Sequence, residues 1–301
     1  MNTLINTKMT RSNSCNRSNI DWLGNAFQAL FFCSAMIGVL SVATIGWFLF
    51  KEGLPAFMEA GVVELVFGRE WLPPALYGIF PMIAATLIST LGALIIGVPI
   101  ALLTAIFLAE IAPKWLANII RPAVELLAGI PSVVYGFFGL VVIVPAIETF
   151  FNIPAGNTLL AGIIVLAIMI LPTIITISET SLRALPTTYK EGALALGASQ
   201  VYSIIKVLVP AAKSGILTGV VLGIARALGE TMAIIMVMGN APAMPGSLLE
   251  PARTLTANIA MEMSYATGIH ASSLYATGIV LLIFIVILNS ALLYINNKRV
   301  S

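Results

Sequence analysis

The sequence is poor in charged residues and in the residues that carry catalytic or redox chemistry. Charged side chains account for 9% of the 301 residues, against about 25% in a typical soluble domain, whereas hydrophobic residues account for 59%. There are two cysteines, Cys15 in a polar segment and Cys33 in the first apolar run, and one histidine. These scarcities exclude a disulfide framework and a multi-histidine metal site, and the composition indicates an integral membrane protein.

The sequence also lacks the residue patterns of common enzymes. No lysine follows a glycine, so the Gly-Lys-Ser/Thr of a phosphate-binding P-loop is absent. The single histidine, His270, lies in a predicted loop with no Ser-His-Asp arrangement and no paired carboxylates. Basic residues are dispersed among the loops instead of forming a stripe for nucleic acid. We therefore expect that the chain is not an enzyme and binds no metal, cofactor or nucleic acid. If its function uses ATP, a partner protein should hydrolyse it.

What the sequence does contain is long apolar runs, each able to cross a bilayer as a helix of about 20 residues. The first run is too long for a signal peptide and should remain as a helix. We predict one all-α membrane domain of six transmembrane helices. Its parts are a cytoplasmic tail at 1–25, the first helix at 26–50, an external loop at 51–76, five helices within 77–296 and a tail at 297–301. The later spans are expected within 71–109 and at Ile119–Ile147, Gly156–Ile177, Ile204–Met238 and Ser272–Ile295.

Glycine and proline mark special places in these spans. The sequence Gly-Ile-Pro-Ser at 129–132 should break the third span, and such irregular backbone is tolerated where it is buried in protein or lines a cavity. Pro210 is expected to kink the start of the fifth span. Gly215, Gly219 and Gly223 recur every four positions and predict close helix packing there.

Lysine and arginine are distributed unevenly between the predicted loops. With the N-terminus inside, only Lys51, Arg69 and Arg253 lie on the external side. The cytoplasmic side holds eleven: Lys8, Arg11, Arg17, Lys114, Arg121, Arg183, Lys190, Lys206, Lys213, Lys298 and Arg299. Because cytoplasmic loops are enriched in Lys and Arg, this bias predicts both termini in the cytoplasm. Trp47 and Trp71 are then expected at the external lipid–water interface.

A short polar helix is expected at residues 188–197, between the fourth and fifth apolar runs. Thr188 and Glu191 have the spacing of a capping box, and Gly197 can take the left-handed conformation that ends a helix. One face is apolar and suits a groove on another protein. This face consists of Tyr189, Ala193 and Leu196. The alternative is an ordinary loop helix, but the predicted orientation places this loop on the side where ATP is available.

This loop resembles the signature sequence of ABC importer permeases. It reads Glu191-Gly192-Ala193, three residues, Gly197, nine residues and Val207-Leu208-Val209-Pro210. Gly192, Val207 and Val209 depart from the Ala, Ile and Leu of the family pattern. The resemblance implies that the loop forms a coupling helix that docks on an ATPase subunit. It assigns the coupling role to Tyr189, Glu191, Gly192, Ala193, Leu196 and Gly197.

Ionisable residues within the apolar runs are few, and each is a functional candidate because a charge in the membrane is costly. Arg226 lies about 18 Å along the fifth span, and Glu230, four residues later, is expected on the same face. Two roles fit this pair: a structural contact that neutralises itself, or a cationic step on an anion path. Glu125 is expected to pair with Arg121 near the inner interface. Glu179 lies at a span end and is expected to be solvated.

Further stretches resemble the permeases of phosphate-specific ABC transport systems, over roughly residues 70 to 296. They are Tyr77–Pro81, Arg121–Leu140, Gly223–Ala233, Ser247–Pro251 and Arg253–Ala257. The last two are closer to the PstC type than to the PstA type, and Ala84-Ala85-Thr86 departs from the family's Gly-Thr pair.

The resemblance implies a type I ABC importer permease that moves inorganic phosphate across the bacterial inner membrane, with Arg226 and Glu230 on the substrate path. The implied partners are a homologous second permease of the PstA type, two copies of a cytoplasmic ATPase that uses ATP and Mg²⁺, and a periplasmic phosphate-binding protein. Alternatives are a sulfate or molybdate permease, an ion-coupled secondary transporter and a structural subunit. A secondary transporter is disfavoured by the single deep acid and the lack of a visible repeat.

Overall fold

The computed structural model describes the backbone of residues 17–297 and the side chains of residue 22 and of residues 24–290. Much of the two predicted tails, at 1–16 and 298–301, lies outside the described residues. Contacts divide the chain into two compact units, Met1–Lys51 and Glu52–Ser301.

The described part of the first unit belongs to one helix, α1 (Arg17–Glu59), which continues into the second unit and so into the predicted external loop. Its segment Gly24–Glu59 is apolar enough to span a membrane, with a mean hydropathy of 2.1. Large apolar side chains such as Phe31 and Trp47 are exposed. A helix that is apolar on all sides is suited to contact with lipid or with another membrane subunit.

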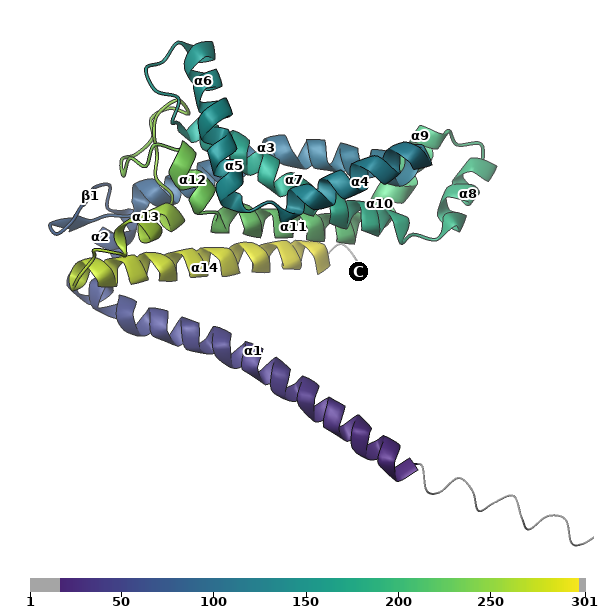
Figure 1. Cartoon of the computed structure of the whole chain (residues 1–301), viewed down its shortest axis with the longest axis horizontal. Coiled ribbons are helices and arrows are strands. Elements are labelled where there is room, and N and C mark those ends of the chain that lie inside the picture. Colours follow the sequence, from purple (N-terminus) through teal and green to yellow (C-terminus); the bar gives the residue numbers. More distant parts are fainter. Residues whose placement is uncertain (1–16, 298–301) are drawn as a thin grey trace, which may run out of the picture. The chain divides into compact units, whose positions relative to one another are not determined.

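The second unit is almost entirely helical, and Figure 1 shows its long helices lying alongside one another. Its elements are α2 (Val62–Phe67), β1 (Trp71–Leu72), β2 (Leu76–Tyr77), α3 (Phe80–Ile106), η1 (Phe107–Ile111), α4 (Lys114–Gly129), α5 (Ser132–Phe138), η2 (Gly139–Ile143), α6 (Val144–Phe151), α7 (Leu159–Arg183), α8 (Thr187–Ala195), α9 (Gln200–Ser203), η3 (Ile204–Leu208), α10 (Val209–Ala211), α11 (Lys213–Gly229), α12 (Met232–Val237), α13 (Leu255–Glu262) and α14 (Ile269–Asn297). The elements η1, η2 and η3 are π-helical turns.

The core of this unit is the packing of α7 against α3 and α11. Small residues make it possible, because membrane helices approach closely where side chains are short. On α3 they recur every four positions and are buried: Ala85, Ser89, Ala93, Gly97, Ala101 and Ala105. A Cβ at Gly97 would lie 2.8 Å from Cδ1 of Ile170 on α7. The glycines of α11 meet α7 as predicted, with Gly215, Gly219 and Gly223 placed against Ser181, Ile177 and Ile174 respectively.

In the described part of the chain, five helices are long and apolar enough to span a membrane. The number is six when Gln200–Ala211 and Lys213–Gly229, bent by 70° relative to each other, are counted as one broken span. This agrees with the predicted six-helix, all-α fold, and the bend falls just after Pro210, where a kink was expected. The short hairpin of β1 and β2, in which Trp71 pairs with Tyr77, was not predicted.

Two predicted spans have different bounds in the structure. The third does not begin at Ile119, because the break separates α4 from α5 and the span-length helix starts at Ser132. Pro131 lacks an N–H and holds Ile130 in an extended conformation, which ends α4. The fifth does not continue to Met238, because α11 ends at Gly229 and α12 is a separate short helix.

Candidate functional site

Two of the predicted spans are interrupted, and the helices that follow the two interruptions pack on each other. The first break separates α4 from α5, the second separates α11 from α12, and α5 packs directly on α12. Gly136 of α5 lies close to α12: a Cβ there would lie 2.8 Å from Cα of Ala233 and 2.8 Å from Sδ of Met236. Irregular backbone at membrane depth is stable where it is buried in protein or lines a cavity, so the crossing of the two breaks is a candidate site.

Arg226 lies beside this crossing, in the last turn of α11. Its Nε is buried without a hydrogen-bond partner, and the side chain forms no ion pair with any described residue. The charge of Arg226 acts on the hydroxyl of Tyr135 on α5, which itself donates to the Leu127 carbonyl across the first break at 2.7 Å. The site therefore presents a guanidinium whose hydrogen-bonding capacity is not used up by the protein.

The expected pair of Arg226 with Glu230 is not formed. The spacing of four residues brings side chains together only within a helix, and α11 ends at Gly229. Glu230 has extended backbone angles, and its Oε1 accepts the N–H of Ala233 at 3.0 Å. Glu230 thus caps the first turn of α12 and shapes the second break, which leaves Arg226 without the predicted counter-charge.

A group of threonines supports the second break, and no pattern in the sequence pointed directly to their role. Thr256 donates from Oγ1 to the carbonyl of Glu230 at 2.7 Å, and its hydroxyl lies 3.1 Å from that of Thr254. Thr86 of α3 accepts the N–H of Leu255 at 3.1 Å. Two of these residues fall in the segment Arg253–Ala257 that resembles the phosphate permeases. The segment around Thr86, where the family pattern is not matched, still supplies a buried hydroxyl.

The predicted polar helix is present as α8 (Thr187–Ala195), and every residue in it is at least partly exposed. Gly197 has φ +84°, as predicted for a left-handed helix end. The N–H of Ala198 donates to Ala193 O at 3.1 Å and that of Gly197 to Leu194 O at 2.9 Å, which is the pairing of a Schellman motif. On the predicted apolar face Leu196 is 91% exposed, so this side chain is free to contact another protein.

The predicted capping box of α8 is wrong. The helix begins at Thr187 with Pro186 as its N-cap, and no side chain caps it. Pro186 has its φ fixed by the ring, and its carbonyl accepts the N–H of Tyr189 at 3.2 Å. Thr188 is consequently inside the first turn and cannot take the N-cap conformation. Glu191 remains exposed on the helix without the backbone contact predicted for it.

One salt bridge and two hydrogen bonds connect α8, α4 and α7 to η1, the turn that follows α3. Lys190 of α8 donates from Nζ to Oε2 of Glu110 in η1 at 2.6 Å. In the same π-helical turn the carbonyl of Leu108 accepts Arg121 Nη2 of α4 at 3.2 Å and Arg183 Nη2 of α7 at 3.5 Å. The turn is therefore held by three cationic side chains from three helices.

Two predictions about acidic residues near this end are corrected. Glu179 is not solvated: its side chain is 9% exposed, its Oε1 accepts a hydrogen bond from Nε of Arg121 at 2.6 Å, and the same oxygen forms an ion pair with Nε of Arg183 at 3.0 Å. Arg121 thus pairs with Glu179 of α7 and not with Glu125, which is exposed on α4. The correct partner is 58 positions away in sequence, so spacing along one helix could not indicate it.

A second buried network lies at the opposite end of α3, around Glu262. Trp71 donates from Nε1 to Glu262 Oε2 at 2.9 Å, His270 Nε2 lies 2.8 Å from the same oxygen, and Arg253 pairs with Oε1. Trp71 is 3% exposed, so it is a core residue and not the interfacial anchor that was predicted. The single histidine, set aside because it had no catalytic partners, belongs to a polar cluster.

The chain matches the family model described as "Binding-protein-dependent transport system inner membrane component" over residues 97–301. It is 41% identical over 272 residues to the "Probable ABC transporter permease protein YqgH" of Bacillus subtilis (strain 168), a match that covers 88% of each chain. It is 39% identical to the "Phosphate transport system permease protein PstC" of Pasteurella multocida (strain Pm70), over 71% of this chain and 73% of that one. The PstC protein of Xylella fastidiosa (strain Temecula1) is 35% identical over 85% of each chain.

Solved structures with the same fold include a bacterial alginate ABC transporter in complex with its periplasmic protein. The TM-score is 0.64 at 16% identity, covering 93% of this chain and 96% of that one. The inward-facing methionine transporter MetNI gives a TM-score of 0.56 at 22% identity, over 73% and 94% of the two chains. The sequence relatives are named as permeases, in agreement with the expectation that this chain is not an enzyme. With up to six apolar spans and a family match over most of its length, this chain belongs to the inner membrane components of binding-protein-dependent transport systems.

Proposed function

We propose that this chain is the PstC-type permease subunit of an ABC importer for inorganic phosphate. The observation that carries the proposal is the buried Nε of Arg226, which has no hydrogen-bond partner where two broken membrane segments cross. An unpaired arginine at membrane depth costs at least about 2.5–3.5 kcal/mol on insertion scales, and a passing anion explains that cost. A guanidinium can give a phosphate two parallel hydrogen bonds.

Glu230 has a different part in this proposal from the one expected. Its own backbone is extended between α11 and α12, and its side chain accepts the N–H of Ala233. In this way Glu230 fixes the break and positions Arg226 at the crossing. The proposal names phosphate as the substrate, and not another oxyanion, because the PstC relatives are named as phosphate transport permeases. The alternatives of sulfate and molybdate remain outcomes of the experiment below.

The coupling part of the proposal rests on α8. Its exposed apolar face and left-handed end at Gly197 suit docking on a cytoplasmic ATPase, two copies of which would use ATP and Mg²⁺. The coupling residues in this proposal are Tyr189, Glu191, Gly192, Ala193, Leu196 and Gly197. A PstA-type permease would complete the membrane part, and a periplasmic phosphate-binding protein would deliver the ion.

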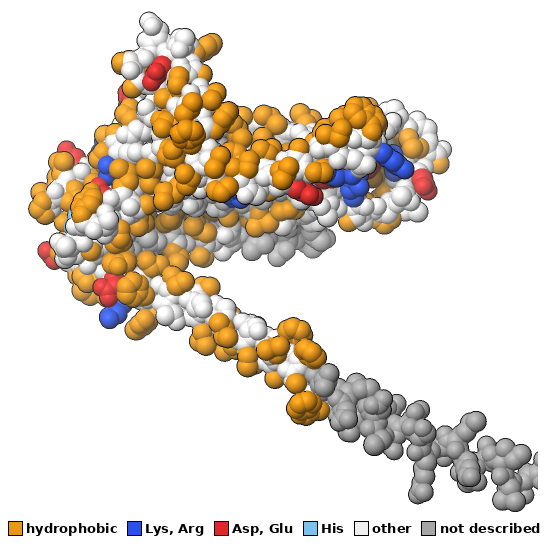
Figure 2. All heavy atoms as spheres, viewed as in Figure 1, with side chains coloured by type: hydrophobic (Ala, Val, Ile, Leu, Met, Phe, Trp, Pro, Cys, Tyr) orange, Lys and Arg blue, Asp and Glu red, His pale blue; other side chains and the backbone are white. Residues whose placement is uncertain are grey.

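We place α8 and both termini in the cytoplasm. The charge distribution supports this, since Figure 2 shows Lys and Arg side chains over the end of the second unit where α4 approaches α8. Arg121 of α4, Arg183 of α7 and Lys190 of α8 form the ion pairs described above. Loops rich in Lys and Arg are retained on the cytoplasmic side of a membrane.

The test is phosphate uptake by proteoliposomes that contain the assembled complex. Arg226→Gln should reduce uptake about a hundredfold or more, because two charge-assisted hydrogen bonds, each worth about 1.5–3 kcal/mol, are lost. Arg226→Lys should be impaired less, since a point charge remains without the bidentate fork. The complex should still assemble and hydrolyse ATP.

Lys206→Gln is the matched control, because it removes an exposed positive charge from Gln200–Ala211, the segment that forms one broken span with α11. Wild-type uptake by the Arg226→Gln variant, or loss of assembly alone, would refute the role of Arg226 in the path. If sulfate or molybdate inhibits phosphate uptake as strongly as added phosphate does, the substrate should be reassigned.

A further inference from the structure

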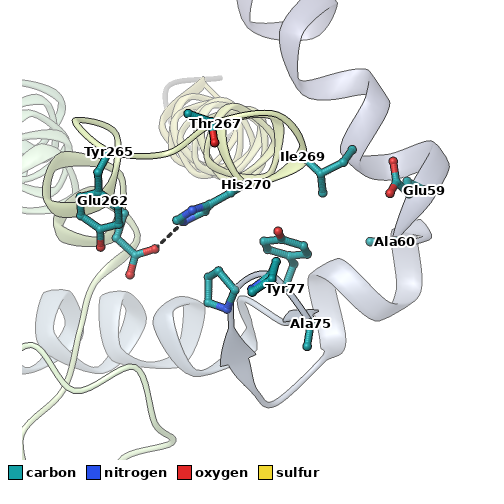
Figure 3. Close-up of a pocket in the computed structure, with 11 residues that line it drawn as sticks. Glu59, Ala60, Ala75, Tyr77, Glu262, Tyr265, Thr267, Ile269 and His270 are labelled. Carbon is teal, nitrogen blue, oxygen red and sulfur yellow. Dashed lines mark hydrogen bonds and ion pairs between the residues drawn. The ribbon is translucent and has the colours of Figure 1, made fainter.

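A cavity lies far along the fold from α8, at the end that carries the β1–β2 hairpin. It has a volume of about 680 Å³. Figure 3 shows it between the end of α1, the hairpin, the end of α13 and the start of α14. Its lining consists of Glu59, Ala60, Pro73, Pro74, Ala75, Tyr77, Glu262, Tyr265, Thr267, Ile269 and His270. It contains neither Arg226 nor a residue of the crossing, so it is a separate feature.

Tyr77 offers the cavity an unused polar group. The residue is 8% exposed, and its hydroxyl points into the cavity without a hydrogen-bond partner among the described residues. Burial, and to a smaller extent the charge of Glu59, raises the pKa of Tyr77. The phenol therefore stays neutral at physiological pH, and its oxygen can accept a hydrogen bond from a ligand.

The charge of the cavity is negative and only partly compensated. Glu262 is already matched, since Trp71, Arg253 and His270 all contact its carboxylate. Glu59 is exposed at the end of α1 and forms no ion pair with any described residue. One carboxylate is thus left free to bind a ligand.

These groups select an organic cation. The uncompensated carboxylate of Glu59 repels an oxyanion, which places the cavity outside any phosphate route. No group of three or more His, Cys, Asp or Glu in the described part of the chain could hold a metal ion. The rings of Tyr77 and Tyr265 supply the aromatic faces that attract an ammonium or a guanidinium, and Glu59 supplies the opposite charge.

The rim of the cavity indicates that this cation belongs to a protein. Tyr265, which lines the cavity, is 65% exposed, and Met58 and Leu72, each next in sequence to a lining residue, are 76% and 60% exposed. Exposed apolar side chains around a pocket are typical of protein interfaces. A free amine would gain little from such a rim, because it would not reach the rim and the pocket together.

We propose that this cavity receives a Lys or Arg side chain of the periplasmic binding protein when that protein docks on the permease. Glu59 and the Tyr77 hydroxyl would hold the cationic head, while Tyr265 would cover its methylene stem. This inference rests on the proposed function, which places the hairpin end in the periplasm.

The experiment measures the affinity of the phosphate-loaded binding protein for the full complex in nanodiscs. Glu59→Gln should weaken binding about tenfold and Glu59→Lys more, with a reduced dependence on salt. Tyr265→Ala should also weaken binding, because it removes the exposed aromatic wall. Glu64→Gln is the matched control, since it removes an exposed carboxylate of α2 at the same end but outside the cavity. Basal ATP hydrolysis without binding protein should be unchanged in all four variants.

A charge exchange identifies the partner residue. Changing each surface Lys and Arg of the binding protein to Glu should produce one variant that binds the Glu59→Lys complex better than wild type does. Unchanged affinity of the Glu59→Lys complex would overturn the proposal, as would an equal loss with Glu64→Gln. Binding of 1,4-diaminobutane to the cavity, with no effect of Glu59→Gln on the binding protein, would reassign the site to a free amine. If the wild-type complex binds the protein but imports no phosphate, the proposed function fails and the cavity proposal does not.

Discussion

Glu179 illustrates how a single buried charge is stabilised within this bundle. Its carboxylate lies between Arg121 and Arg183, and both arginines also donate to the carbonyl of Leu108. Removing one partner from a buried charge network is expensive, because the remaining charges stay desolvated without compensation. The four residues therefore form a unit in which α4, α7 and η1 depend on one carboxylate.

Glu179→Gln should lower the free energy of unfolding by about 3–5 kcal/mol. The loss is large because two arginines would share one uncharged amide. Glu125→Gln is the control: Glu125 is exposed on α4, and its replacement should change stability by less than about 1 kcal/mol. Reversible unfolding in mixed micelles, followed by circular dichroism, measures both variants. Equal stabilities of the two would contradict the role assigned to Glu179.

At this scale the sequence identified which residues matter better than it identified their partners. Arg226 and Glu230 were recognised as unusual because charges are rare in apolar runs, and Arg121 was noted as the expected partner of Glu125. Their partners were predicted from spacing within one helix, a rule that fails when the helix ends or when a neighbouring helix supplies a closer group. Glu230 illustrates the first case and Arg121 the second.

The interruptions of helices were predictable where their cause is covalent. Pro131 excludes an N–H and restrains the residue before it, so the break at 129–132 was expected. The break after Gly229 has no proline, and depends on Glu230 and Thr256, which act through tertiary hydrogen bonds. The hairpin at residues 71–77 was missed because its sequence is as apolar as the span that follows.

The end of α8 offers a matched pair of glycines. Gly197→Ala should destabilise the helix end by about 1–2 kcal/mol, because φ is +84° there and a side chain in the left-handed region is strained. Gly192→Ala should instead stabilise α8 by about 1 kcal/mol, since this position is helical and a Cβ meets nothing within 4 Å. Hydrogen exchange of residues 187–199 reports both effects. Faster exchange in both variants, or in neither, would show that Gly197 does not set the helix end.

If α8 couples the permease to an ATPase, these same variants should differ in transport. The number of ATP molecules hydrolysed per phosphate imported should rise in Gly197→Ala, because the docking face is less well held. In Gly192→Ala the ratio should rise less, because the helix end at Gly197 is retained and only a methyl group is added to the coupling helix.

For the molecule as a whole, the number of spans followed from the bilayer. A run of about 20 apolar residues has no stable position except across the hydrocarbon core, so six spans could be counted from the sequence. The arrangement of the helices could not, because it depends on which small residues face which helix. The cavity at Glu59 was also hidden, since its lining comes from three stretches that lie far apart in the sequence.

The orientation of the second unit can be tested with two single cysteines in a chain whose Cys15 and Cys33 are replaced by serine. Gln200→Cys, beside α8, should be protected from a membrane-impermeant maleimide in intact spheroplasts and labelled after lysis. Met244→Cys, in the loop before α13, should be labelled in intact spheroplasts; its side chain is 47% exposed. The reverse labelling pattern would invert the proposed topology.

The contact of Gly136 with Ala233 has a consequence for how such chains diverge. A Cβ at Gly136 would meet the Cα of Ala233, a backbone atom that no substitution at position 233 removes, and it would also meet Sδ of Met236. A side chain at position 136 therefore has no space unless the two helices separate. Across related chains, position 136 should remain glycine whichever residue stands at position 233, while Gly129, where a Cβ meets nothing within 4 Å, should vary.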